Sequence, residues 1–143
     1  MPDAVPFKLV TPAEVVFDGS AELVIAVTTE GEEGILPKHA PFLAALKPGV
    51  LRANVRRTGD GEGNVTRLEL ATSEGFMQAL PDRITVLVDE ALAFDDVVVA
   101  TARDRLAEAT ERQKAEAPGS GGYAREQAVI DFANAQLRLT GHR

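Results

Sequence analysis

The chain has 143 residues, enough for one ordinary domain or for a small domain with an appendage. Its 15 Lys and Arg residues against 22 Asp and Glu residues give a formal net charge of −7, which argues against a nucleic-acid surface because phosphate binding needs clustered basic side chains. The absence of cysteine excludes disulfides, thiolate metal sites and cysteine nucleophiles. No apolar run approaches the roughly 20 residues of a spanning helix and the start lacks a signal-peptide pattern, so we expect a soluble, cytosolic protein.

The first part of the chain is rich in turn-forming residues. Residues 1–89 hold 8 of the 12 glycines and 7 of the 8 prolines. Short apolar or alternating segments between the turns predict strands at residues 7–10, 15–17, 22–28, 34–36, 50–56, 65–72, 75–80 and 83–88. Many short strands with frequent turns indicate an antiparallel sandwich or barrel rather than a βαβ sheet.

The second part, residues 90–143, is rich in alanine and predicts two helices, with a domain boundary between Asp89 and Asp95. Asp95 or Asp96 is the expected cap of the first helix, which runs to about Lys114. The second helix runs from about residue 123 to residue 139. Apolar stripes of small residues on both helices favour close packing as an antiparallel hairpin, with Val98, Ala102, Leu106 and Ala109 on the first and Ala128, Phe132, Ala135 and Leu139 on the second.

The hairpin carries few large apolar side chains, so its two helices alone bury little apolar surface. We therefore expect it to be marginally stable and to depend on docking to another surface. A segment of this kind can change partners.

Enzyme chemistry has little support in the sequence. His39 lies between two prolines and His142 lies next to the last residue, and we interpret His39 as a structural or interface residue rather than a general base. The segment GDGEGN at residues 59–64 resembles a phosphate or calcium loop only superficially, since its carboxylates would repel phosphate and its spacing does not fit an EF-hand. It predicts a hairpin loop between two strands.

The most informative segment is EGEEGILPKHAP at residues 30–41, followed by LKPG at residues 46–49. It resembles the pattern of the epsilon subunit of bacterial F-type ATP synthase, the counterpart of the mitochondrial delta subunit, except that Lys38 stands where the family usually has glycine. The resemblance covers the whole chain. Its further parts are LVTP at 9–12, VFDG at 16–19, SEGFM at 73–77, where Glu74 replaces a glycine, and RITVLVD at 83–89.

The resemblance implies a ten-stranded β-sandwich at residues 1–89 and a two-helix hairpin at residues 90–143. It also implies a non-catalytic central-stalk, or rotor, subunit that holds no cofactor and couples the membrane rotor ring of c subunits to the gamma subunit of a proton-translocating enzyme. Catalysis lies on the beta subunits of the head. The chain would be a peripheral protein, without membrane insertion, on the cytoplasmic face of the bacterial plasma membrane, and its hairpin could inhibit ATP hydrolysis by contacting the alpha and beta subunits.

The resemblance places the expected rotor-ring interface at Glu30, Glu32 and Glu33 and the expected gamma-subunit interface at His39, Ala40, Pro41 and Phe42. The β-branched run at residues 97–99 weakens the first helical turn, so the expected hinge is Asp95, Val97 and Val98. The basic residues of the first helix give the expected head contact, which is Arg103, Arg105 and Arg112. These three arginines alternate with acidic residues, so they also fit an ordinary solvated helix face.

Two other interpretations come from different classes of protein. A free-standing β-sandwich that binds a small molecule or carbohydrate usually displays aromatic platforms, but this chain has no Trp and one Tyr. A small hydrolase would need partners for His39 that the sequence does not identify.

Some relatives bind ATP through an Asp and an Arg at the start of the first helix. Here Val98 or Thr101, depending on the alignment, stands at the Arg position. Without that guanidinium we expect no tight ATP binding.

Overall fold

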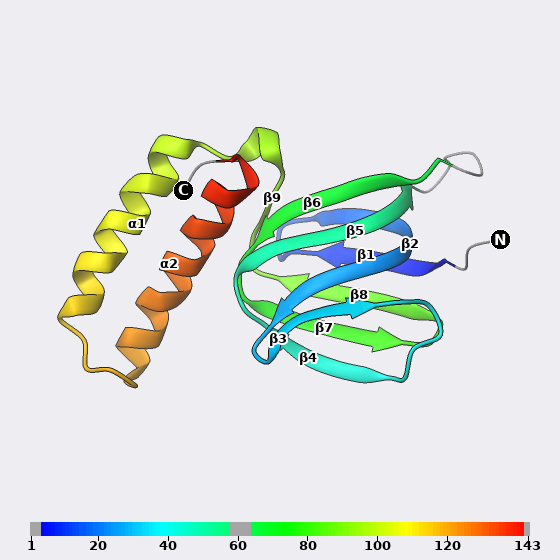
Figure 1. Cartoon of the computed structure of the whole chain (residues 1–143), viewed down its shortest axis with the longest axis horizontal. Coiled ribbons are helices and arrows are strands. Elements are labelled where there is room, and N and C mark those ends of the chain that lie inside the picture. Colours follow the sequence, from blue (N-terminus) through cyan, green and yellow to red (C-terminus); the bar gives the residue numbers. More distant parts are fainter. Residues whose placement is uncertain (1–3, 58–63, 142–143) are drawn as a thin grey trace.

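The computed structural model, described over residues 4–57 and 64–141, is a β-sandwich with a helical hairpin docked at one end (Figure 1). Nine strands are present in the described residues: β1 (Val5–Val10), β2 (Val15–Thr28), β3 (Gly31–Ile35), β4 (Phe42–Leu46), β5 (Gly49–Arg57), β6 (Thr66–Thr72), β7 (Gly75–Leu80), β8 (Arg83–Val88) and β9 (Ala91–Leu92). A short 3₁₀ turn, η1 (Phe94–Asp96), leads to helices α1 (Val99–Lys114) and α2 (Gly121–Leu139).

The strands form one sheet that folds into two layers. The order is β1-β8-β7-β4-β2-β5-β6-β9, with β3 added to β2 and a further pairing between β1 and β2. All pairings are antiparallel except that of β1 with β8, so the sheet is mixed rather than purely antiparallel. The long strand β2 joins the layers because its first half pairs with β1 and its second half with β3.

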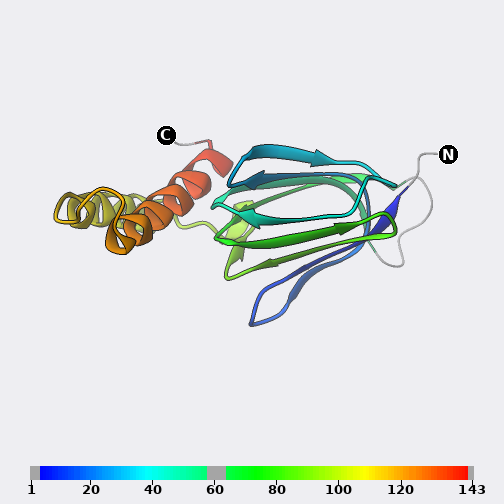
Figure 2. The ribbon, with the colours of Figure 1, turned by 90° about the horizontal axis from the view of Figure 1, so that it is seen from below.

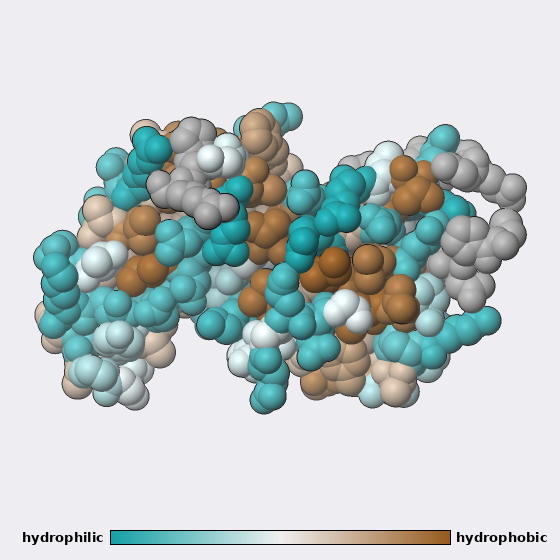
Figure 3. All heavy atoms as spheres, viewed as in Figure 1, coloured by the Kyte–Doolittle hydropathy of each residue, from teal (hydrophilic) through white to brown (hydrophobic). Residues whose placement is uncertain are grey.

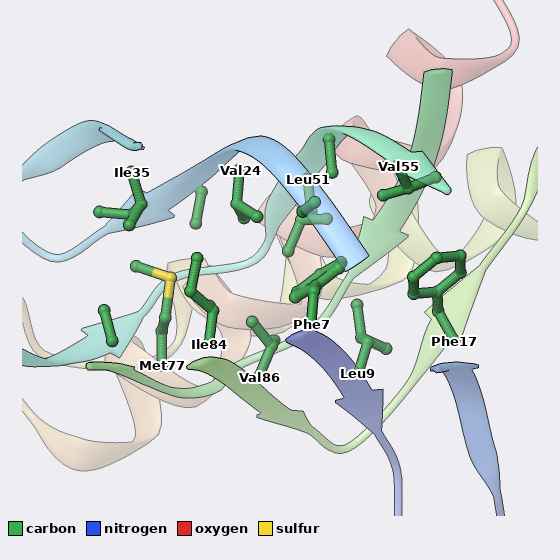
Figure 4. Packing of buried hydrophobic residues seen from close by; sticks show 14 of the residues in the cluster. Phe7, Leu9, Phe17, Val24, Ile35, Leu51, Val55, Met77, Ile84 and Val86 are labelled. Carbon is green, nitrogen blue, oxygen red and sulfur yellow. The ribbon is translucent and has the colours of Figure 1, made fainter. Parts of the chain in front are cut away.

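The core lies between the two layers because the strands alternate buried and exposed residues. In β1, for example, Val5, Phe7 and Leu9 point inward while the residues between them are exposed. Figure 4 shows side chains from both layers meeting in this space, and the rings of Phe7 and Phe17 lie 5.5 Å apart. The sandwich therefore has a core of its own.

The hairpin packs against the sandwich mainly through α2. Figures 1 and 2 both show α2 closer to the strands than α1, and in Figure 3 the hairpin and the sandwich form two lobes with a notch between them. The contact is a second, small apolar cluster in which Phe132 and Ala135 of α2 pack on Ala71 of β6. The partly buried residues around this cluster are Val50, Leu92 and Leu139. The α2 stripe predicted to face α1 thus faces the sandwich instead.

The contacts between α1 and α2 are more polar than predicted. Ala102 and Ala109 are the buried residues of α1, whereas Val98 is 61% exposed and does not belong to the contact. Gln113 donates hydrogen bonds to the Gln127 side chain at 2.9 Å and to the Tyr123 carbonyl at 3.3 Å. These side-chain amides join α1 to α2, while the apolar stripe of α2 packs on the sandwich.

The helix boundaries are close to the prediction, but the predicted cap of α1 is wrong. Val98 is its N-cap and offers no side-chain hydrogen bond, while Asp96 accepts a bond from the Ala93 amide at 3.2 Å and closes the preceding 3₁₀ turn. Ser120 caps α2 by accepting a bond from the Tyr123 amide at 3.1 Å.

Candidate binding surfaces

The three carboxylates of the expected ring interface lie at the tip of the β2–β3 hairpin. A tight turn shapes this tip: the Thr28 hydroxyl donates to the Gly31 carbonyl at 2.7 Å and accepts from the Glu30 amide at 3.1 Å, and Gly31 has a φ of +118° that favours glycine. Glu32 and Glu33 lie on strand β3, which begins at Gly31 and not at residue 34 as predicted. The pairing of Gly31 to Ile35 with β2 extends the strand through these residues.

Strand periodicity points Glu32 and Glu33 to opposite faces of β3. Glu33 and Glu30 line a groove of about 320 Å³ together with Phe42 and Leu43 of β4. Glu32 instead lies beside Val27 on the outer face of the layer that contains β2 and β5. The structure therefore separates Glu32 from the other two carboxylates.

Glu32 is already paired within the chain. Arg52 of β5 reaches across β2, and its Nη2 atom donates to the two carboxylate oxygens of Glu32 at 2.7 Å and 3.1 Å. The side chain of Glu32 is 51% exposed and that of Arg52 is 33% exposed, so the pair is open to solvent on one side. Sequence reasoning missed Arg52 because its contact with Glu32 depends on the order of three strands.

The expected gamma interface contains one residue in an unusual backbone conformation. Lys38 has a φ of +63°, the left-handed region that glycine adopts without strain, at the position where the family usually has glycine. The next residue, His39, forms a hydrogen bond of 2.7 Å between Nδ1 and the Ala40 carbonyl, and its ring meets Phe42 edge-on at 6.1 Å. These contacts fit the structural or interface role expected for His39.

An apolar face that the sequence analysis did not identify begins next to this segment. Leu43 of β4, Phe76 of β7 and Leu87 of β8 are 72%, 56% and 52% exposed on three adjacent strands. Phe76 and Leu87 are directly opposite each other in the register. Both also line a groove of about 630 Å³ that extends toward Val10 and Pro12. We refer to Leu43, Phe76 and Leu87 as the apolar face.

The expected hinge residues lie in the segment that connects the last strand of the sandwich to helix α1. Asp95 is exposed in η1, and Val98 is exposed in extended backbone at the start of α1. The strand β9 that precedes them is two residues long and pairs with β6.

The three arginines of the expected head contact lie on α1 and are exposed. Arg112 pairs with Glu126 of α2 at 3.0 Å and with Glu108 at 3.7 Å, so it also links the two helices. Arg105 lines a groove of about 500 Å³ between hairpin and sandwich, opposite Glu74. Among the described residues, Arg103 and Arg105 have no ion-pair partner.

The remaining features to consider are metal sites, membrane-spanning helices, His142 and the glycine-rich segment. Within residues 4–57 and 64–141 no group of three or more His, Asp and Glu residues is arranged to hold a metal ion. No helix of this described part is long and apolar enough to cross a membrane. His142 and most of the glycine-rich segment at 59–64 lie outside the described residues.

Comparisons with known proteins agree with this architecture. Residues 4–94 match the sequence model of the family described as ATP synthase, Delta/Epsilon chain, beta-sandwich domain. The ATP synthase epsilon chain of Chromobacterium violaceum is 35% identical over 131 residues, which cover 92% of this chain and 89% of that relative. The epsilon chain of Teredinibacter turnerae is 37% identical over 131 residues, 92% of this chain and 88% of the relative.

The fold is also shared with solved structures. A chain of the mitochondrial ATP synthase of Euglena gracilis superimposes with a TM-score of 0.73 at 19% identity, covering 99% of this chain and 84% of its own length. A chain from the central stalk and c-ring of the Tetrahymena thermophila enzyme gives a TM-score of 0.58 at 23% identity, covering 94% and 97%. With the family match over the sandwich and relatives above 30% identity over most of the chain, the protein belongs to the ATP synthase delta/epsilon chain family.

Proposed function

We propose that this subunit is a non-catalytic part of the central stalk that couples the membrane rotor ring to the gamma subunit of a proton-translocating ATP synthase. It would sit peripherally at the cytoplasmic face of the bacterial plasma membrane. The observation that carries the proposal is the apolar face on β4, β7 and β8. Large apolar side chains exposed side by side on a soluble domain are typical of a surface that a partner protein covers.

The gamma subunit is the proposed partner of the apolar face. The residues expected at this contact, His39, Ala40, Pro41 and Phe42, immediately precede Leu43 in the chain. Pro41 is exposed, as Leu43 is, whereas the Phe42 side chain packs against the sandwich core. Burying Leu43, Phe76 and Leu87 would supply the apolar centre of such an interface, and Pro41 would stiffen its edge. A broad, rigid contact suits a subunit that transmits torque.

The rotor ring is the proposed partner of the β2–β3 tip. Glu32 would be the main residue of this contact. Its carboxylate is half exposed beside Arg52 and can accept a hydrogen bond from a basic ring side chain on its open side. Glu30 and Glu33 lie at the same tip and would add negative charge around it.

The hairpin is proposed as a regulatory element that inhibits ATP hydrolysis when it leaves the sandwich. In the described residues its apolar contact with the sandwich is the small cluster around Phe132. The connection at Asp95, Val97 and Val98, in which Asp95 and Val98 are exposed, would act as the hinge. Arg103, Arg105 and Arg112 would then be available to acidic surfaces of the alpha and beta subunits.

Single-cysteine cross-linking tests these contacts, because the natural chain has no cysteine and each variant carries one thiol. In the assembled enzyme Leu43→Cys, labelled with a photoreactive maleimide, should cross-link to gamma and Glu32→Cys to the ring subunit. Val65→Cys, exposed just before β6 on the other layer from Leu43, is the control and should give neither product. Failure of Leu43→Cys to reach gamma would contradict the assignment of the apolar face.

A further inference from the structure

The last turn of α2 ends beside the surface that carries Glu32. A groove of about 570 Å³ is lined on the sandwich side by Glu32, Arg52 and Glu69, and on the hairpin side by Arg138 and Leu139. Leu139 also belongs to the small cluster that docks the hairpin. One groove thus includes both the proposed ring-binding carboxylate and residues of the docked hairpin.

The charges of this groove depend on whether the hairpin is present. Arg52 pairs with Glu32 and lies opposite Glu69 in the β5–β6 register, so the sandwich side alone has two negative charges and one positive charge. Arg138 brings a second positive charge, which makes the complete groove neutral. Among the described residues, neither Arg138 nor Glu69 forms an ion pair. Both side chains can therefore attract or repel a charged group that enters the groove.

We propose that Arg138 and Leu139 form one wall of the ring-binding site, so that the docked hairpin weakens the binding of a basic ring side chain at Glu32. The inference rests on the ring contact in the proposed function. Arg138 repels an incoming cation. Release of the hairpin carries Arg138 away from Glu32 and opens the groove. By the same coupling, occupation of the groove by the ring favours release of the hairpin.

The expected effect is modest because the groove is open to solvent. Interactions between exposed charges are worth roughly a factor of two to five in binding and weaken with salt. Arg138→Gln should therefore tighten binding about two- to five-fold at low salt, and the gain should shrink at high salt.

The experiment measures the affinity of the full-length chain for the detergent-solubilised ring purified from the same cells. Glu32→Gln should weaken binding and Arg138→Gln should tighten it. Arg125→Gln is the matched control: it removes the same charge from the same helix, 13 residues or about 20 Å along it, and should change nothing.

Each outcome has a distinct meaning. If Glu32→Gln weakens binding but Arg138→Gln does not tighten it, the ring contact stands and the inference about the hairpin is wrong. An equal gain with Arg125→Gln would also overturn it, because net charge alone would then explain the effect. If Glu32→Gln has no effect, or the wild-type chain does not bind at about 1 mM, the proposed ring contact itself fails.

Discussion

Replacing Phe132 by alanine should release the hairpin and leave the sandwich folded. Phe132 is 7% exposed and is the one large buried side chain in the cluster that docks α2. Removing a buried phenylalanine side chain typically costs about 3–5 kcal/mol. The other buried members of this cluster, Ala71 and Ala135, are too small to compensate, whereas the sandwich core contains none of these three residues.

Hydrogen exchange followed by mass spectrometry measures this effect directly. A loss of about 3 kcal/mol corresponds to faster exchange by about 100-fold, and this should be confined to α1 and α2. Peptides from β1 and β8 should keep the protection of the wild-type chain. Val129→Ala is the matched control on the same helix, because Val129 is 37% exposed and its truncation should raise exchange far less than Phe132→Ala does.

Two results would refute this reasoning. If α2 in Phe132→Ala exchanges as slowly as in the wild type, then the small cluster does not hold the hairpin. If β1 and β8 lose protection by the same factor as α2, then hairpin and sandwich unfold as one unit, and the hairpin cannot move independently.

Three further predictions concern stability and ligands. Gly75→Ala should lower the melting temperature by several degrees, because a Cβ atom there would overlap the Leu87 carbonyl oxygen, whereas Gly34→Ala, which has room, should be nearly neutral. Ser120→Ala should cost about 1 kcal/mol through loss of the α2 cap, seen by circular dichroism as an earlier loss of helix on heating, and an unchanged helix signal would contradict it. Isothermal calorimetry of the isolated chain with ATP should show no binding heat, and micromolar affinity would show that another residue replaces the missing arginine.

Much of the fold could be predicted because local patterns determine it. Residues 75–80 and 83–88 lie between turn signals and are rich in apolar residues, and the structure has strands at those bounds. The helix bounds are predicted within three residues because alanine-rich segments end at a glycine-rich break. Residues 15–17 and 22–28 were predicted as two strands but form one, since the polar segment between them pairs with β1 and β5.

The sequence could not predict which surface covers a buried face or which apolar side chains stay exposed, because both depend on residues far along the chain. The stripe on α2 indicates a buried face but does not say whether α1 or the sandwich covers it. Phe76 and Leu87 suit either face of a strand, and they are exposed only because Met77, Val86 and Val88 take the inner positions. Predicting that Glu32 and Glu33 face opposite sides of the sheet would have required the pairing register of β3.

The central claim is that this chain is a stalk subunit bound to both gamma and the rotor ring. Purification of the affinity-tagged chain from detergent-solubilised membranes of its own cells tests it most directly. The account predicts that gamma and the ring subunit co-elute with the tagged chain in fixed proportion through size-exclusion chromatography. Elution of the chain alone, with the intact ATP synthase in a separate fraction that lacks it, would contradict the account.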